Sequence, residues 1–525
     1  MLLVSYSFAA FLAVLLLGCF LVPERFRWLF LLLFSLIFYG AGGPQYLVYP
    51  LVTALSTWYL GKRIDRIGRE AKAYLKTQNF DRAQKKEYNR SVKKRQKRYL
   101  ILGLVLNFGI LAAIKYTPFF YEICNGLLGI FGLSFGFSLP GWTLPLGISY
   151  YTFQTMGYLV DVYNKTEEAE ENPAKLGLFT LYFPQLTAGP VSRFGALKET
   201  LFSPEPMSFL RFKRAGFRIL WGYFKKLVIA DRLGPAVLVI TQDPQTYHGI
   251  YGLLGILGYT LWMYADFSGC IDIVLGISEA IGIRLPENFD RPFASKSLAE
   301  LWRRWHMTLM QWFREYIFFP VSTSNLAKRL SNGLSKRLSR EVGNRVPLYL
   351  GSLTVWLVTG IWHGASWNYV SWGLANCVVM LASQELAGVF KSARSRFGFT
   401  KTKAYGYFEC IRTCLLFAVL LMFQYYPFPV VFAMLIDVAA GSRISDLFDG
   451  RFAGLGLAAG DLWILALGLV LLVISGLRKE SIQDLLLKKH WLIQYLAAFG
   501  LFLLILLFGV YGHGYDASQF IYNQF

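Results

Sequence analysis

Two histidines in the middle of the chain are the residues whose type and setting most favour chemistry. His363 lies in the sequence IWHGASWNYVSWG, and His306 lies in LWRRWHMTLMQWF. Between Arg345 and Glu385 there is no Asp, Glu, Lys or Arg, and His363 is the only histidine. An imidazole in so apolar a stretch is costly unless it has hydrogen-bond partners or a task. A packed histidine bonded to a neighbouring carbonyl and a general base both fit this pattern, and residue type alone does not separate them.

The stretch from residue 264 to residue 376 is the most polar part of the chain and the richest in tryptophan. Its many charged residues stand beside apolar runs, where contact with lipid would be costly. We therefore expect them to face an aqueous cavity or a funnel at headgroup level, or to form paired networks. Residues 297–319 mix aromatic and basic side chains between Pro292 and Pro320. This predicts one helix that lies at the membrane interface or tips into a cavity.

The elements that must position these residues are membrane helices. Hydrophobic residues make up 55% of the 525 residues and charged residues only 16%, whereas soluble domains carry about 25% charged residues. Apolar runs recur along the whole chain, and crossing the hydrocarbon core takes roughly 20 such residues. The sequence therefore predicts an all-α, polytopic integral membrane protein with roughly a dozen transmembrane or re-entrant helices. We expect one domain, residues 1–525, with its catalytic core at about 144–376.

The charge distribution indicates an orientation in the membrane. The formal net charge is +21, and residues 62–98 hold fifteen Lys or Arg against four acidic residues. Smaller basic clusters occupy residues 328–345 and 391–403. We expect these loops to lie in the cytoplasm and to contact anionic lipid of a bacterial inner or plasma membrane. The acidic residues 167–171 are expected on the opposite face, and no nucleic-acid partner is expected.

Several motifs of other enzyme classes are absent from the sequence. Neither His306 nor His363 begins an HxxxxD motif, and there is no HExxH, P-loop or GxSxG signature. The six cysteines lie mostly within or beside apolar runs without a CxxC pair, which is typical of small buried side chains. We expect neither a metal nor a bound cofactor.

Four blocks together resemble the membrane-bound O-acyltransferase family, in particular its alginate O-acetyltransferase membrane subunits. They read LYFPQLTAGPVSRF, FSGCIDIVLGISEAIGIRLPENFDR, LWRRWHMTLMQWFREYIF and IWHGASWNYVSWG, and the closing FIYNQF is similar to the end of this group. The sequence departs from the group at residues 420–432, where LLMFQYYPFPVVF replaces an aromatic-Phe-Arg motif. The resemblance therefore does not specify the acceptor or the partner.

The resemblance implies helices around a central tunnel and transfer of an acyl group through it. It implies that His363 is the catalytic histidine on the tunnel wall and that His306 is a second polar catalytic residue. The further candidates for contacts with substrate or tunnel are Asn288, Arg304, Trp305, Trp362, Ser366 and Asn368. The donor implied is a cytoplasmic thioester, acetyl-CoA. The acceptor is a hydroxyl of an extracytoplasmic protein or polysaccharide, such as an alginate-like exopolysaccharide or a cell-wall glycan. A separate extracytoplasmic acetyltransferase and a polysaccharide-synthesis complex are the expected partners.

Three alternatives stay open at this point. A D-alanyl transferase of the teichoic-acid type would use a carrier-protein thioester as its donor. A transporter or flippase would also place charges and broken helices along a substrate path. A structural scaffold for a glycan-synthesis complex would tolerate replacement of His363.

Overall fold

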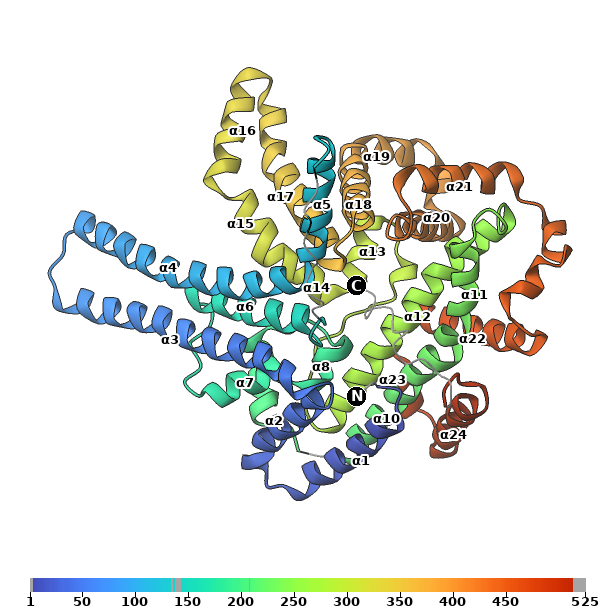
Figure 1. Cartoon of the computed structure of the whole chain (residues 1–525), viewed down its shortest axis with the longest axis horizontal. Helices are drawn as coiled ribbons and strands as arrows, with labels where there is room; N and C mark the ends of the chain where they lie inside the picture. The colour runs from blue at the N-terminus through green and yellow to red at the C-terminus, as the bar shows by residue number, and fades with distance from the viewer. Residues whose placement is uncertain (1–2, 134–135, 137–142, 207, 513–525) are drawn as a thin grey trace. The chain divides into compact units, whose positions relative to one another are not determined.

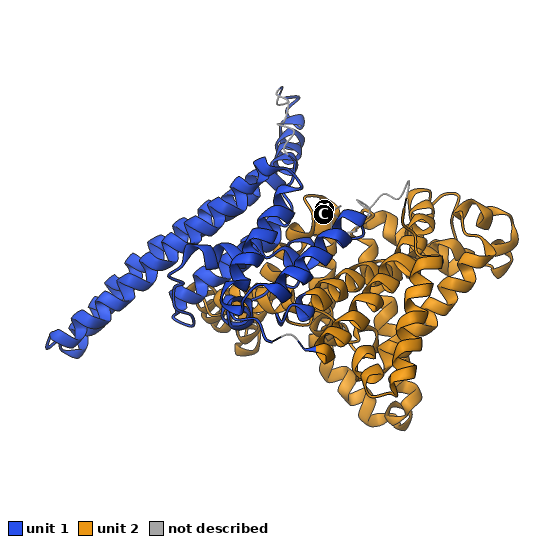
Figure 2. Cartoon of the chain, turned by 90° about the horizontal axis from the view of Figure 1, so that it is seen from below, with its two compact units in different colours: residues 1–208, 278–285 blue, residues 209–277, 286–525 orange. Residues whose placement is uncertain are grey.

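A computed structural model describes residues 3–133, 136, 143–206 and 208–512 of the chain (Figure 1). The described residues are mostly helical, as predicted, and their β-type pairing consists of one isolated bridge between Phe289 and Trp305. The terminal FIYNQF motif lies outside the described residues. The chain divides into two compact units, coloured separately in Figure 2. A single domain over residues 1–525 stays a prediction.

Unit 1 comprises residues Met1–Ser208 and Ser278–Leu285. Its helices are α1 (Tyr6–Leu21), α2 (Glu24–Gly40), η1 (Pro44–Leu47), α3 (Val48–Thr77), α4 (Arg82–Lys115), α5 (Thr117–Gly129), α6 (Ile148–Asn164), α7 (Pro173–Leu181), α8 (Phe183–Ala188) and α9 (Phe194–Phe202). The apolar runs predicted from the sequence at the start of the chain correspond to α1, α2 and the first part of α3.

Unit 2 comprises residues Phe209–Ile277 and Pro286–Phe525. Its longer helices are α10 (Phe209–Tyr223), α11 (Asp231–Gln242), α12 (Ile250–Ala280, whose last residues belong to unit 1), α16 (Asn325–Arg337), α17 (Arg340–His363), α18 (Trp367–Glu385), α19 (Ala387–Arg396), α20 (Lys403–Met422), α21 (Phe428–Gly441), α22 (Ala459–Leu477) and α24 (Trp491–Phe508). Its shorter elements are the π-helices η2 (Phe224–Ala230) and η4 (Arg314–Phe318), the 3₁₀ helices η3 (Pro292–Ala294), η5 (Gly398–Lys401), η6 (Ile444–Phe448) and η7 (Arg451–Leu455), and the α-helices α13 (Leu298–Arg304), α14 (Met307–Phe313), α15 (Phe319–Ser322) and α23 (Ile482–Leu487).

Five helices are long and apolar enough to cross a membrane, and a bent pair formed by α18 and α19 makes a possible sixth. They are α4, α12, α20, α22 and α24. The apolar window of α12 is 83% buried inside the protein, but that of α24 is only 6% buried. Such an exposed apolar surface needs lipid around it, so the chain is a membrane protein. The larger number of spans and the tunnel stay predictions.

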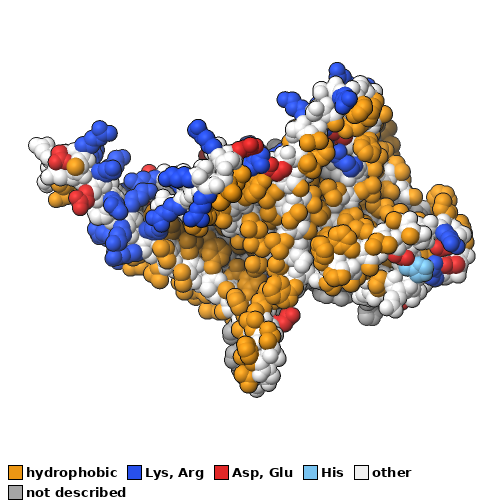
Figure 3. Space-filling view, turned by 90° about the horizontal axis from the view of Figure 1, so that it is seen from above, with side chains coloured by type: hydrophobic (Ala, Val, Ile, Leu, Met, Phe, Trp, Pro, Cys, Tyr) orange, Lys and Arg blue, Asp and Glu red, His pale blue; other side chains and the backbone are white. Residues whose placement is uncertain are grey.

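The basic segment 62–98 is a helical hairpin rather than the short loop that we expected. The charged halves of α3 and α4 continue directly from their apolar halves. Asp81 and Gln84 form a reciprocal capping box that starts α4, which satisfies backbone N–H groups at the helix end. Lys and Arg side chains gather on the surface of this hairpin (Figure 3).

The expectation that the acidic residues 167–171 lie on the face opposite the basic segment is wrong. The Glu171 carboxylate pairs with Lys62 (2.7 Å) and Arg69 (3.1 Å) on the charged half of α3. The Trp58 indole also donates a hydrogen bond to the Glu171 carbonyl at 3.1 Å. Glu171 therefore neutralises part of the basic hairpin. The sequence does not indicate these ion pairs, because Glu171 lies 102 residues after Arg69 and still farther after Lys62.

The core of unit 2 is rich in tryptophan, and a cluster of aromatic rings lies where four of its helices pack together. Trp302 of α13 lies 5.2 Å from Trp356 of α17, 5.9 Å from Trp372 of α18 and 5.5 Å from Phe417 of α20, measured between ring centroids. Each of these rings is buried. Such close aromatic pairs stabilise packing beyond their buried area, and they fix the four helices that surround the candidate site.

Candidate active site

Two short antiparallel segments bring His306 and Asn288 together in unit 2. The Asp290 amide donates to the Arg304 carbonyl at 3.0 Å, and the Met307 amide donates to the Asn288 carbonyl at 3.0 Å. Between these bonds lies the bridge of Phe289 and Trp305. The PENFD and WRRWH motifs of the sequence are therefore neighbours in space.

This pairing breaks the single helix that we predicted over residues 297–319. Helix α13 ends at Arg304 and α14 begins at Met307, with His306 between them. His306 has φ 47° and ψ 47°, in the left-handed region. A non-glycine residue costs roughly 1–2 kcal/mol there, and such residues cluster at functional sites. The prediction was wrong because the pairing with Asn288 outweighs the helical preference of the segment.

The hydrogen bonds of Asn288 fix the protonation of the His306 ring. The Asn288 Oδ1 atom accepts from the Thr308 amide (3.2 Å) and hydroxyl (2.9 Å). His306 Nδ1 lies 3.3 Å from the same oxygen, so Nδ1 carries the proton and donates. In the neutral ring the lone pair is then on Nε2. Burial, and next the neighbouring His363, hold the pKa of His306 well below its ordinary value, so this ring stays neutral at physiological pH.

His363 is the last residue of α17, and its ring is oriented by its own helix. Its Nδ1 lies 2.7 Å from the Thr359 carbonyl oxygen one turn earlier. A carbonyl only accepts hydrogen bonds, so Nδ1 carries the proton and Nε2 carries the lone pair. A neutral imidazole held in this tautomer can take a proton at Nε2, as a general base must.

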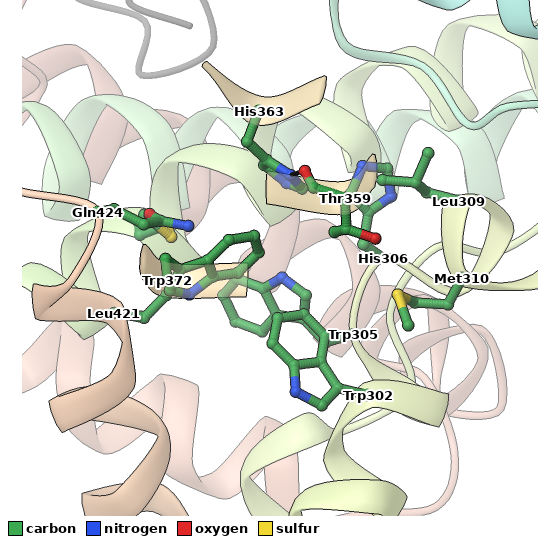
Figure 4. A pocket seen from close by; sticks show the side chains of 11 residues that line it. Trp302, Trp305, His306, Leu309, Met310, Thr359, His363, Trp372, Leu421 and Gln424 are labelled. Carbon is green, nitrogen blue, oxygen red and sulfur yellow. Dashed lines mark hydrogen bonds between the residues drawn. The ribbon is translucent and has the colours of Figure 1, made fainter. Parts of the chain in front are cut away.

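Both histidines line one cavity of about 20 Å³, shown in Figure 4. This is room for about one water-sized group. Its lining contains no Asp, Glu, Lys or Arg: the residues are Met263, Trp302, Trp305, His306, Leu309, Met310, Thr359, His363, Trp372, Leu421 and Gln424. The Trp362 ring lies 6.1 Å from the His306 ring and 4.8 Å from the His363 ring. The sequence did not show that the two histidines meet; the fold of unit 2 brings them to the same cavity.

The other predicted site residues fall into two groups. Trp305 lines the cavity. Asn288 does not line it but contacts His306, and Trp362 does not line it but its ring contacts the rings of both histidines. The remaining three lie elsewhere. Arg304 pairs with Glu300 at 2.7 Å, Asn368 donates to the Tyr425 carbonyl at 3.0 Å, and Ser366 is the N-cap residue of α18.

Three polar residues of the cavity were not among the predicted site residues. Thr359 orients His363, while Trp372 and Gln424 bring an indole N–H and an amide to the lining. Thr359 and Trp372 lie in the apolar stretch around His363, where periodicity alone would assign them to packing. Gln424 offered a usable signal, because it is the one amide in the apolar segment 420–432.

A second, larger cavity of about 520 Å³ in unit 2 comes close to the same motif. Phe289, Asp290 and Met307, which flank Asn288 and His306 in sequence, line it. The Phe289 ring is 5.1 Å from the Trp305 ring, and Trp305 lines the histidine cavity. An aromatic wall thus lies between the two cavities.

Ion pairs on one side of the larger cavity satisfy its buried charges. Arg218 contacts Asp272 at 3.0 Å and Glu287 at 2.5 Å. Lys225 contacts Asp272 at 2.6 Å. The charges of the polar stretch therefore form a paired network beside a cavity, the two arrangements expected from their cost in lipid. The described residues contain no group of three or more His, Cys, Asp or Glu side chains that could hold a metal ion.

The chain is similar to known membrane acyltransferases. Residues 171–335 match the model of the membrane-bound O-acyltransferase family. The "Probable alginate O-acetylase AlgI" of Azotobacter vinelandii is 32% identical over 357 residues, which are 67% of this chain and 62% of that protein. The "Peptidoglycan O-acetyltransferase" of Helicobacter pylori is 29% identical over 335 residues, 58% of each chain.

The relatives also include proteins named for a different acyl transfer, that of D-alanine to teichoic acid. The "Teichoic acid D-alanyltransferase" of Bacillus subtilis is 28% identical over 240 residues, 45% of this chain and 58% of that protein. The match thus spans about three fifths of the length of these curated relatives. With the all-α membrane fold, the family model and these relatives together, this chain belongs to the membrane-bound O-acyltransferase family.

Proposed function

We propose that this chain is an O-acyltransferase that moves an acetyl group from cytoplasmic acetyl-CoA to a hydroxyl outside the cell membrane. The acceptor hydroxyl belongs to an extracytoplasmic protein intermediary or to a polysaccharide, either an alginate-like exopolysaccharide or a cell-wall glycan. One observation carries the proposal: two histidines with Nε2 lone pairs line one buried cavity without charged side chains. The relatives named as O-acetylases support acetyl as the group transferred.

His363 is the proposed general base of the reaction. The acceptor O–H gives its proton to His363 Nε2 while its oxygen bonds to the thioester carbonyl carbon. The tetrahedral intermediate then collapses, the C–S bond breaks, and the imidazolium returns the proton to the leaving thiolate. The products are an ester and a free thiol. His306, kept neutral by burial, orients the acceptor hydroxyl toward this proton transfer.

Asn288 is the proposed donor to the oxyanion that develops during attack. It is fully buried beside His306. Its Nδ2 group has no hydrogen-bond partner within the part of the chain that the structure describes. A buried, unsatisfied N–H is costly in the resting protein, and a donor held in place beside the reacting groups can stabilise a negative oxygen as it develops.

The larger cavity suits the polar part of a thioester donor. Arg478 and Lys479 line this cavity and are exposed, so they can bind phosphate groups without breaking the buried ion pairs of Arg218 and Lys225. They lie in the loop between α22 and α23, on the segment that connects α22 with α24, and both of these longer helices are suited to span the membrane. By the positive-inside rule this loop faces the cytoplasm, where acetyl-CoA is available.

An acceptor outside the membrane implies partner proteins for this chain. The proposed partners are a separate extracytoplasmic acetyltransferase, which would receive or complete the transfer, and a polysaccharide-synthesis complex. The teichoic acid D-alanyltransferase relatives favour a second candidate function, in which the donor is a D-alanyl carrier protein and the same histidines act.

The test is thiol release by the full-length protein in lipid nanodiscs, supplied with acetyl-CoA or with a D-alanyl carrier protein. We expect release from acetyl-CoA, and we expect His363→Ala to reduce it by roughly 10²- to 10⁴-fold, the usual contribution of a general base. His248→Ala is the matched control, since His248 lies in a turn and is half-exposed.

The outcomes separate the candidates. Release from the carrier protein alone would assign the D-alanyl reaction. Equal release by wild type and by a correctly folded His363→Ala variant would remove His363 from the mechanism. Exchange or movement of a substrate without thiol release would favour a transporter.

A further inference from the structure

The basic half of α4 carries a row of cations that no carboxylate of the described residues neutralises. Residues 82–98 contain nine Lys or Arg and one acidic residue, Glu87. Four of the cations recur at the spacing i, i+4, i+8 and i+11, which places them on one face of a helix. We call them the basic stripe: Lys86, Arg90, Lys94 and Lys97. All four are exposed, and none forms an ion pair within the part of the chain that the structure describes.

The charged half of α3, by contrast, is neutralised within the protein. Arg66 pairs with Glu70 at 2.7 Å, and Arg69 pairs with both Asp65 and Glu171. The stripe on α4 lacks such partners, although like charges four residues apart destabilise a helix. Membrane orientation requires only that basic residues be present, and it does not require them on one face. The stripe therefore calls for an anionic partner from outside the chain.

A packed seam between α3 and α4 holds the stripe on a fixed support (Figure 1). Ile67 and Ala71 of α3 pack with Val92 of α4. The buried Gln96 amide donates to the Ile64 carbonyl at 2.9 Å. Three aromatic rings with centroids between 5.3 and 6.0 Å apart close the turn end of the hairpin: Tyr74, Phe80 and Tyr88. The hairpin is therefore a folded projection and not a loose loop.

The length of α4 carries part of the stripe away from lipid. Helix α4 is one of the helices suited to cross a membrane, and its residues 99–114 carry no charge. The helix has 34 residues, so at about 1.5 Å per residue it is about 51 Å long. The hydrocarbon core takes about 30 Å of this length and one headgroup layer about 6 Å, which leaves roughly 15 Å in the cytoplasm.

The two ends of the stripe therefore meet different surroundings. Lys94 and Lys97 stand next to the uncharged span, so their long side chains reach the headgroups. Lys86 and Arg90, which we call the outer pair, lie one to two helical turns farther from the membrane. Headgroup charges are screened over about 8 Å at physiological salt. Lipid therefore leaves the outer pair free for a soluble partner.

We propose that the outer pair, Lys86 and Arg90, docks an acidic surface of a soluble cytoplasmic protein. Carboxylates suit this hairpin, because the Glu171 carboxylate already bridges two cations of α3. A nucleic acid suits it less, because Glu87 interrupts the basic row and would repel a continuous phosphate backbone. A protein can place a basic side chain opposite Glu87. The inference goes beyond the proposed function, since it depends on the cytoplasmic location of the hairpin and not on acyl transfer.

A model acidic helix tests the docking site on the full-length protein in nanodiscs. The probe is a fluorescent, alanine-based helical peptide with Glu at every fourth position. Its Lys counterpart and an oligothymidylate of equal charge are compared with it. Nanodiscs of phosphatidylcholine alone, and with added phosphatidylglycerol, separate protein docking from lipid contact. We expect fluorescence anisotropy to show binding of the Glu peptide in both kinds of nanodisc, and salt to weaken it.

Charge reversal then assigns the binding to the outer pair. The double variant Lys86→Glu, Arg90→Glu should bind the Glu peptide at least about tenfold more weakly, and it should bind the Lys peptide more tightly than the wild type does. Each new Glu stands four residues from a remaining cation, Arg82 or Lys94. Such pairs stabilise a helix, so the thermal unfolding midpoint should not fall. Misfolding is thereby separated from loss of docking.

The matched control is the double variant Lys328→Glu, Arg329→Glu, which makes the same charge change at exposed residues near the start of α16. It should keep the wild-type affinity within about twofold. Equal weakening by both double variants would mean that the peptide responds only to net charge. Loss of binding with phosphatidylglycerol would place the outer pair on the headgroups, and tighter binding of oligothymidylate would assign a nucleic acid. Any of these results, or no binding by the wild type, would overturn the docking site.

Discussion

At the scale of single residues, the backbone of His306 is the least expected feature. Its left-handed conformation is held by the pairing of its neighbours with Asn288 and by the hydrogen bond from its own Nδ1. An active site that stores strain in this way needs a surrounding structure that fixes the residue. The conformation and the imidazole can be tested separately, because asparagine adopts the left-handed region more readily than other non-glycine residues.

We expect His306→Asn and His306→Ala to differ in stability and to agree in activity. Both substitutions remove the imidazole, so both should lower thiol release. Alanine should cost roughly 1 kcal/mol more than asparagine because it tolerates the left-handed region less well. The measurement is the thermal unfolding midpoint of each variant in the same nanodiscs. Equal midpoints would show that the conformation of residue 306 carries no strain.

The sequence pointed to the two histidines, whose catalytic role stays a prediction, but it did not show their surroundings. A lone imidazole in an apolar stretch is costly enough to draw attention to His363, and the family resemblance adds His306. Arg304, Ser366 and Asn368 are equally suited by residue type, yet none of them lines the cavity. Arg304 and Asn368 make their contacts elsewhere, and Ser366 is the N-cap residue of α18. Whether a side chain reaches the cavity depends on the direction in which it points, and that direction depends on where each helix begins and ends.

At the scale of elements, the close packing of α17 against α18 positions His363. A Cβ atom on Gly360 would lie 2.4 Å from the Tyr369 carbonyl oxygen, and one on Gly373 would lie 2.3 Å from the Trp356 carbonyl oxygen. These distances involve backbone atoms, which cannot move without separating the helices. The two glycines therefore allow α17 and α18 to approach and bring Trp372 against the His363 ring.

Gly373→Ala should therefore reduce activity through helix packing. We expect a lower unfolding midpoint and a loss of thiol release, since overpacking costs typically 1–3 kcal/mol. Gly388→Ala in α19 is the control, because a Cβ there meets nothing within 4 Å. A Gly373→Ala protein with wild-type stability and activity would show that the two helices can shift apart without moving His363.

The elements themselves were predicted unevenly, for physical reasons. Long apolar runs became helices because length and hydropathy are local properties of the sequence. The break between α13 and α14 was missed because it depends on hydrogen bonds to Asn288 and Asp290, which lie across a turn and an intervening helix. The helical form of residues 62–98 was missed because the charge run was read as a loop, although Lys, Arg, Gln and Glu all favour helices.

At the scale of the whole molecule, the charge distribution predicts which ends of the helices share a side of the membrane. The basic half of α4 and the loop after α22 should both lie in the cytoplasm. Helix α22, Ala459–Leu477, is apolar along its length, so the segment before it should lie outside. Transfer from a cytoplasmic donor to an external acceptor requires this arrangement, because otherwise the larger cavity would open away from acetyl-CoA.

Single cysteines in a background without the six native ones test this orientation in intact cells. Ser91→Cys in α4, Lys479→Cys after α22 and Ser445→Cys before α22 all replace exposed residues. A membrane-impermeant maleimide should label only Ser445→Cys, while a permeant maleimide should label all three. External labelling of Lys479→Cys would place the larger cavity outside the cell and exclude it as the donor site. External labelling of Ser91→Cys without labelling of Lys479→Cys would place the basic hairpin outside the cell and the larger cavity in the cytoplasm. The apolar half of α4 would then cross the membrane in the direction opposite to the one predicted.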